Sequence, residues 1–234
     1  MTATMPWQGV LFDLDGTLLD TAQDMAGALN DLRSEAGLSP LPFAVIRPHA
    51  SHGSTAMVQV GFGLAPGDAF EAMRQRFLDR YAARIALETR LFPGGEELLL
   101  ALETAGLKWG VITNKPAYLT EPLMAALELT PRAACIVSGD TLPQRKPHPA
   151  PLLHGAAQAG LNPAACVYVG DAERDVQAAR AAGMTALVAH FGYLADTDRP
   201  DTWGAHGSVH SMADIATWLR LPFSDAVHSS ASRR

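Results

Sequence analysis

The second half of the chain repeats one order of elements: a helical pattern, an Ala-Gly pair and a short apolar run. The helical patterns lie at residues 96–106, 152–160 and 176–183, and the apolar runs that follow them lie at 109–113, 166–170 and 185–189. Helices that alternate with short, continuously apolar strands are typical of a parallel sheet covered on both faces. The sequence therefore predicts an α/β fold with a doubly wound parallel sheet.

The segment before this repeat has helical patterns only. Residues 21–36 place apolar side chains at helical spacing, and residues 66–87 repeat apolar positions every three or four residues with arginines on the other face. We expect an all-helical insertion at 20–89, with a loop at 49–54. The sheet domain would then comprise residues 1–19 and 90–221, and the Ser-rich residues 222–234 would form a flexible tail.

The stretch at residues 10–20 combines a β-prone apolar run with two nearby carboxylates, Asp13 and Asp15. Gly16 follows them and allows the backbone to turn at once. Two close carboxylates repel each other, so they need a cation or a proton between them. We interpret the pair as a divalent-metal site with an aspartate nucleophile; the simpler alternative is an ordinary Asp-Gly turn after a strand.

Other polar residues follow the later apolar runs. The run at 109–113 leads into Thr113-Asn114-Lys115-Pro116, and the run at 166–170 leads into Asp171, with Asp175 one helical turn later. Lys146 lies in a Pro-rich loop before a helix. Because ligands bind beyond the carboxyl ends of parallel strands, these residues are candidates for a single site. Taken singly, Thr113 and Asp175 could cap helices and Lys146 could be a surface lysine.

The run Asp13-Leu14-Asp15-Gly16-Thr17 resembles the first motif of the haloacid dehalogenase-like hydrolase superfamily. Thr113, Lys146, and Gly170-Asp171 with Asp175 match the remaining motifs in the same order. The resemblance spans nearly the whole chain, and it implies a Rossmann-like core with an inserted helical cap domain at 20–89.

The resemblance also implies a chemistry for each residue. Asp13 would be the nucleophile that forms an aspartyl-phosphate, and Asp15 the general acid and base. Mg²⁺ would be held by Asp13, Asp171 and the backbone carbonyl of Asp15. Lys146 and Thr113 would bind phosphoryl oxygens, and Asp175 would orient Lys146 or a metal-bound water. Further candidates for substrate binding are Gly16 and Asn114.

The identity of the phosphate ester is less constrained by the motifs. The stretch at 47–54 is the best candidate for touching the leaving group, with Arg47 and Gly53 as candidate residues. The run Thr113–Pro116 is similar to phosphoglycolate phosphatases, which implies a Mg²⁺-dependent phosphoric monoester hydrolase acting on 2-phosphoglycolate. Residues 109–116 and 203–205 are also similar to N-acetylmuramic acid 6-phosphate phosphatases, so this substrate stays open.

Two further classes of protein share some or all of this pattern. Relatives of β-phosphoglucomutase share all four motifs and keep the aspartyl-phosphate as a cofactor. Receiver-like signalling modules also combine acidic residues, Thr and Lys on an α/β sheet. The helical insertion and the Gly16-Thr17 pair after Asp15 argue against a receiver. Rapid release of inorganic phosphate from several esters would favour a phosphatase, and activity that needs a sugar bisphosphate would favour a mutase.

Composition excludes several other kinds of partner. The net charge is -6 and no cluster of Lys and Arg occurs, which argues against nucleic acid. No run of ~20 apolar residues occurs and the N-terminus lacks a signal pattern, so we expect a cytoplasmic protein without a membrane partner. Cys135 and Cys166 lie in apolar runs and are expected to be buried free thiols. We expect a monomer or homodimer that binds a small phosphate monoester.

Overall fold

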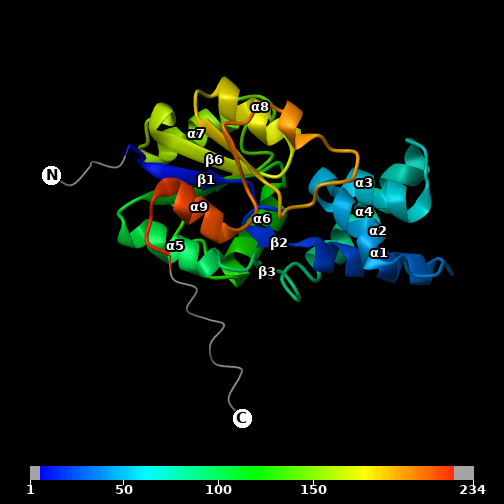
Figure 1. Ribbon diagram of the computed structural model, residues 1–234. Coiled ribbons are helices and arrows are strands. Elements are labelled where there is room, and N and C mark those ends of the chain that lie inside the picture. Colours follow the sequence, from blue (N-terminus) through cyan, green and yellow to red (C-terminus); the bar gives the residue numbers. More distant parts are fainter. Residues whose placement is uncertain (1–5, 224–234) are drawn as a thin grey trace, which may run out of the picture.

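A computed structural model describes residues 6–223 of the chain. Its main sheet has six parallel strands in the order β5-β4-β1-β6-β7-β8 (Figure 1). The strands are β1 Gly9–Phe12, β4 Lys108–Ile112, β5 Ile136–Val137, β6 Cys166–Gly170, β7 Thr185–Ala189 and β8 Gly207–Val209. The predicted α/β fold with a parallel sheet is confirmed.

Alternate residues of a strand point to opposite faces of the sheet. Apolar side chains therefore lie on both faces here, and helices cover both. Val10 and Phe12 of β1 belong to one apolar cluster and Leu11 to the other. The first face is covered by α5 Gly95–Thr104, α6 Ala117–Ala126 and α9 Met212–Leu219, and the second by α7 Ala150–Ala159 and α8 Glu173–Ala181. Two short 3-10 helices lie in connections of the sheet: η2 Pro163–Ala165 between α7 and β6, and η3 Pro200–Thr202 between β7 and β8.

The helices between β2 and β3 pack on one another beside the sheet (Figure 1). They are α1 Ala22–Glu35, α2 Phe43–Ile46, η1 Arg47–His52, α3 Gly53–Phe62 and α4 Asp68–Ala82. Phe70, Phe77 and Tyr81 form the buried face of α4, as the apolar spacing predicted. The two chain connections to this helical segment are β2 Leu19–Asp20 and β3 Arg90–Leu91, which pair antiparallel.

The structure differs from the sequence-based expectation in two places. The predicted loop at 49–54 is wrong, since η1 covers Arg47–His52 and α3 begins at Gly53. Pro48 presets the backbone for a helical start, and the polar residues of η1 hide its periodicity. The helix predicted at 66–87 is shorter, because α4 ends at Ala82. The predicted tail at 222–234 lies outside the described residues from position 224 onward.

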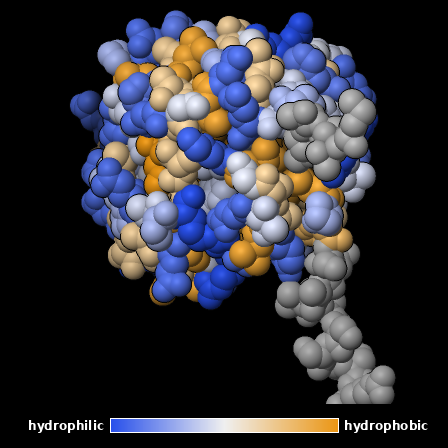
Figure 2. All heavy atoms as spheres, turned by 90° about the vertical axis from the view of Figure 1, so that its left-hand side faces the viewer, coloured by the Kyte–Doolittle hydropathy of each residue, from blue (hydrophilic) through white to orange (hydrophobic). Residues whose placement is uncertain are grey.

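The surface remote from α1–α4 carries hydrophilic residues interspersed with smaller hydrophobic areas (Figure 2). Within residues 6–223, no helix combines the length and the apolar character needed to cross a bilayer. Cys135 and Cys166 are buried and free, as predicted. Burial raises the pKa of the Cys135 thiol to about 12 and that of Cys166 to about 11.

Candidate active site

The candidate site lies at the carboxyl ends of β4, β1 and β6, which are neighbours in the sheet. These strands are followed directly by Thr113, Asp13 and Asp171, which are all buried. Asp13 accepts a hydrogen bond of 2.7 Å from the Leu14 N–H. The strand order thus brings three polar side chains to one edge, although they come from distant parts of the chain.

Lys146 is buried among the acidic residues of this edge. Its Nζ lies 2.9 Å from Asp13 Oδ1 and 2.7 Å from Asp175 Oδ1, and it donates a 2.9 Å hydrogen bond to the Tyr168 hydroxyl. Burial raises the pKa of Tyr168 well above its usual value, so this hydroxyl stays neutral. The lysine therefore meets both carboxylates with its charge shielded from solvent.

Asn114 holds the backbone of Lys146. The Asn114 side chain donates to the Lys146 carbonyl and accepts from the Lys146 N–H, each over 3.0 Å. This pair of hydrogen bonds connects the loop after β4 to the loop before α7. Asn114 lines the pocket, but its amide is engaged with Lys146 in this arrangement.

Asp13, Asp171 and Asp175 form a compact acidic cluster. One oxygen of each lies within 4.8 Å of the others, and all three residues are buried. Burial, together with the charges of Asp13 and Asp175, raises the pKa of Asp171 to about 7. Burial also raises the pKa of Asp175, against the opposing influence of Lys146. Burial and the mutual repulsion of these carboxylates therefore favour a bound proton or cation at the cluster.

The residues of this cluster fit a divalent cation. Asp171 Oδ2 accepts hydrogen bonds from the Ser51 hydroxyl, over 2.5 Å, and from the Tyr193 N–H, over 2.9 Å. Asp171 Oδ1 is buried and has no hydrogen-bond partner among residues 6–223. Asp175 uses one oxygen for Lys146 and the other for the Ala172 N–H. Hard carboxylate oxygens with one position left open suit Mg²⁺ or a similar ion.

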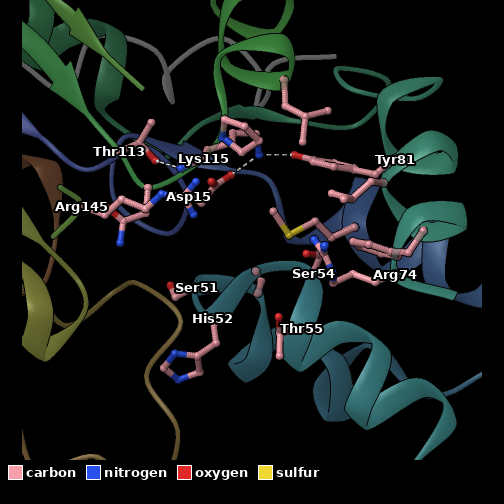
Figure 3. A pocket seen from close by; sticks show the side chains of 18 of the residues that line it. Asp15, Ser51, His52, Ser54, Thr55, Arg74, Tyr81, Thr113, Lys115 and Arg145 are labelled. Carbon is pink, nitrogen blue, oxygen red and sulfur yellow. Dashed lines mark hydrogen bonds and ion pairs between the residues drawn. The ribbon is translucent and has the colours of Figure 1, made fainter. Parts of the chain in front are cut away.

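A cavity of about 590 Å³ opens between this edge and the helical segment. Asp13, Asp15, Thr113 and Asn114 line it from the sheet, and Gly53 lines it from α3. Figure 3 shows the polar side chains of this pocket, including Asp15 and Thr113 on one side and Ser51, His52, Ser54 and Thr55 on the other. Five of the predicted site residues therefore line one pocket.

Arg47 is not brought to this pocket. Its guanidinium donates a 2.9 Å hydrogen bond to the Phe191 carbonyl and lies 4.9 Å from the centre of the Tyr193 ring. The arginine is thus engaged by the loop after β7. Ser51, four residues later on the same 3-10 helix, reaches Asp171 instead.

Several residues of the site were not predicted from the sequence. Lys115 contacts Asp15, Tyr81 of α4 contacts Lys115, and Arg174 donates to the Ser51 carbonyl over 2.6 Å. The position of Lys115 directly after Thr113-Asn114 was a usable signal, since that run leads into the site. Tyr81 gave no such signal, because its spacing matched an ordinary buried helix face.

Comparisons with known proteins identify the family of the chain. A model of the haloacid dehalogenase-like hydrolase family matches residues 10–189. A phosphoglycolate phosphatase of Xanthomonas campestris pv. campestris is 48% identical over 214 residues, which cover 90% of this chain and 97% of that protein. An N-acetylmuramic acid 6-phosphate phosphatase of Pseudomonas aeruginosa is 41% identical over 202 residues, covering 86% and 89%.

A solved structure gives the same result at the level of the fold. The crystal structure of a predicted phosphoglycolate phosphatase from Haemophilus somnus 129PT matches with a TM-score of 0.80 and 25% identity. The match covers 92% of this chain and 99% of that one. One family thus accounts for most of the sequence and its motifs, and we conclude that the chain belongs to the haloacid dehalogenase-like hydrolase family.

Proposed function

We propose that this protein hydrolyses small phosphate monoesters by transferring the phosphoryl group to Asp13. The observation that carries the proposal is the contact between Asp13 Oδ1 and the buried Lys146 Nζ, at 2.9 Å, beside a second pocket carboxylate, Asp15. A carboxylate held against a buried lysine is suited to attack an anionic substrate, because the cation offsets part of the repulsion.

The reaction has two steps. Asp13 attacks phosphorus and the bond from phosphorus to the ester oxygen breaks, while Asp15 gives a proton to the departing oxygen. Lys146 and the Thr113 hydroxyl hold phosphoryl oxygens in place. In the second step Asp15 takes a proton from water, which attacks phosphorus and releases inorganic phosphate and free Asp13.

Mg²⁺ is the proposed cofactor. Asp13, Asp171 and the backbone carbonyl of Asp15 would hold it, and Asp175 would keep Lys146 oriented through their 2.7 Å contact. When bound, the ion supplies positive charge that offsets the charge of the phosphate and the carboxylates. The raised pKa of Asp171 supports this assignment, since burial and the neighbouring charges of Asp13 and Asp175 disfavour the bare carboxylate, and a bound cation would offset both effects.

The helical segment at 20–89 is proposed to be the cap of the site. Residues of η1, α3 and α4 line the pocket opposite the sheet, among them His52, Thr55 and Arg74. A cap in this position excludes water during phosphoryl transfer and contacts the leaving group. The remaining part, 1–19 and 90–221, would form the catalytic core.

For the substrate we propose 2-phosphoglycolate. Arg74, Arg145 and Arg174 line the pocket and suit a substrate with a carboxylate besides its phosphate. The name of the Xanthomonas relative, at 48% identity, supports the same ester.

A second candidate substrate is N-acetylmuramic acid 6-phosphate, which also has a carboxylate. The cavity of about 590 Å³ favours it, because a ligand as small as 2-phosphoglycolate leaves most of that space unfilled. The name of the Pseudomonas relative points to this ester as well.

The test is a panel of esters assayed with Mg²⁺ for release of inorganic phosphate. It includes 2-phosphoglycolate, N-acetylmuramic acid 6-phosphate and glucose 6-phosphate, compared by kcat/KM. We expect the highest value for 2-phosphoglycolate; a higher value for the muramic acid ester would select the second candidate. Activity only in the presence of a sugar bisphosphate would indicate a mutase instead.

Asp13→Asn tests the nucleophile. We expect this variant to fold normally and to lose phosphate release, because an amide cannot form the aspartyl-phosphate. Asp31→Asn, on the exposed side of α1, is the control and should keep full activity. Normal turnover by Asp13→Asn would mean that another residue attacks phosphorus.

A further inference from the structure

Lys115 is a second buried lysine of the site, and its backbone is firmly held. The Lys115 N–H donates to Thr113 Oγ1 over 3.1 Å, and its carbonyl accepts from the Gly139 N–H over 2.8 Å and from the Thr120 hydroxyl over 3.2 Å. Only 4% of its side chain is exposed. The position of the ammonium group is therefore fixed from both the main chain and the surrounding packing.

The Lys115 ammonium connects two parts of the molecule. It donates to Asp15 Oδ1 over 2.8 Å and to the Tyr81 hydroxyl over 2.7 Å, and it lies 4.5 Å from the centre of the Tyr81 ring. Figure 3 shows Lys115 between these two side chains. Tyr81 belongs to α4 of the helical segment, whereas Lys115 lies in the loop after β4. The helical segment thus contacts the lysine that touches Asp15, the proposed acid.

The two oxygens of Asp15 have different surroundings. Oδ1 accepts from Lys115 Nζ over 2.8 Å and from the Thr21 hydroxyl over 2.7 Å. Oδ2 accepts no hydrogen bond from any residue between 6 and 223. One oxygen thus fixes the orientation of the carboxyl group, and the other is left for a ligand in the pocket that Asp15 lines.

We propose that Lys115 is a positioning residue for the proton transfers of Asp15, and that Tyr81 makes this positioning depend on the seating of α4. This inference rests on the proposed phosphatase function. A proton donor must lie within hydrogen-bond reach of the atom it serves, so a carboxyl group free to rotate loses efficiency. The contact through Tyr81 makes the orientation of Asp15 best when the helical segment lies against the core.

The leaving group provides a readout that a merely structural lysine would not change. An acidic leaving group such as p-nitrophenolate departs without a proton, whereas phenolate, which has nearly the same shape, benefits from one. Neither ester has a carboxylate, so a direct contact between Lys115 and a substrate carboxylate does not enter the comparison. Values of kcat/KM report the first phosphoryl transfer, in which the leaving group departs.

The main variant is Lys115→Met, which keeps the length of the side chain and removes its charge. We expect kcat/KM to fall about 100-fold for phenyl phosphate and less than about threefold for p-nitrophenyl phosphate, because general acid catalysis acts only on the former. Lys108→Met is the matched control: Lys108 bonds the Ala159 carbonyl and does not line the pocket, so both esters should be unaffected.

Tyr81→Phe tests the connection to α4 and does not depend on the folding of the lysine variant. It removes one hydroxyl and keeps the ring, so we expect a fall of up to about tenfold for phenyl phosphate and a smaller one for p-nitrophenyl phosphate. The proposal would be overturned if kcat/KM fell by the same factor for both esters in Tyr81→Phe, or in a Lys115→Met variant that folds. A wild-type protein that releases phosphate from no ester would instead overturn the proposed function.

Discussion

Gly16 lies where a positive φ coincides with a close approach to the acidic cluster. Its φ is 80°, and a Cβ atom added there would collide with Asp171 Oδ2. We expect Gly16→Ala to lower kcat about 100-fold, because Asp171 would have to move from its place beside Asp13. The measurement is the rate of phosphate release at saturating Mg²⁺ and substrate, together with the melting temperature.

Gly37→Ala separates the two effects that act at Gly16. Gly37 has a similar φ of 72°, but nothing lies within 4 Å of an added Cβ. Gly37→Ala therefore introduces only the strain of a positive φ, which should lower the free energy of unfolding by about 1 kcal/mol, and it should retain full activity. Equal loss of activity in both variants would show that backbone strain, and not the approach to Asp171, matters at Gly16.

The individual site residues were predictable where they directly follow an apolar strand. This group contains Asp13, Thr113 and Asp171, because the carboxyl ends of neighbouring parallel strands lie at one edge of the sheet. Arg47 and Lys115 show the limit of this reasoning. Whether a side chain faces the pocket or a neighbouring loop depends on contacts such as those of Arg47 with Phe191 and of Lys115 with Tyr81, which no local pattern encodes.

Among the helices, α1 is attached to the far end of the helical segment through Asp24. This buried side chain accepts hydrogen bonds at Oδ2 from the Glu88 N–H, the Thr89 N–H and the Thr89 hydroxyl, over 2.8 to 3.0 Å. Asp24→Ala should lower the free energy of unfolding by about 3 kcal/mol, because these donors lose a charged acceptor in a buried place. Urea unfolding measures the change.

Asp31→Ala is the control for Asp24. Asp31 lies 3.1 Å from Arg84, the same arginine that approaches Asp24 at 3.6 Å, but 46% of its side chain is exposed. Exposed ion pairs contribute little, so this variant should lose less than about 0.5 kcal/mol. If the two variants unfold at the same urea concentration, the hydrogen bonds of Asp24 do not stabilise the segment as described.

The sequence predicted the central strands better than the short helices, and the difference has a physical reason. β4, β6 and β7 are continuously apolar because helices cover both faces, and this pattern is distinctive. By contrast, η1 has a polar sequence, and its six residues are held by their position between α2 and α3. Short helices of this kind depend on tertiary contacts, which explains why the expected loop at 49–54 was wrong.

For the molecule as a whole, the acidic cluster predicts that Mg²⁺ stabilises the folded state. We expect added Mg²⁺ to raise the melting temperature of the wild type, since an ion that binds only the folded form shifts the equilibrium towards it. Asp171→Asn should lose this shift, because it removes a proposed ligand. The measurement is thermal unfolding in EDTA and in millimolar Mg²⁺.

Two comparisons make this experiment specific. Sodium chloride at equal ionic strength accounts for general screening of charge. In EDTA, Asp171→Asn should melt at or above the temperature of the wild type, because burial and neighbouring carboxylates already raise the pKa of Asp171 to about 7. A Mg²⁺ shift of the same size in both proteins would place the ion elsewhere.

The order of strands in the sheet was the part of the architecture that the sequence determined least. Apolar runs and their connecting helices predict a parallel sheet, but they do not state that β1 lies between β4 and β6. That placement is what gathers Asp13, Thr113 and Asp171. The strand order itself was not predicted. That these residues share one site was expected from the binding of ligands beyond the carboxyl ends of parallel strands and from the resemblance of the four motifs to one family.

The antiparallel pairing of β2 with β3 has a consequence for how such a molecule can diversify. Asp20 pairs with Arg90, so the helical segment leaves and re-enters the sheet domain at adjacent points. An insert with neighbouring ends can be lengthened, shortened or exchanged as a cassette without disturbing its host. The proposed chemistry of Asp13 and Lys146 would then stay unchanged while a different helical insert selects a different ester.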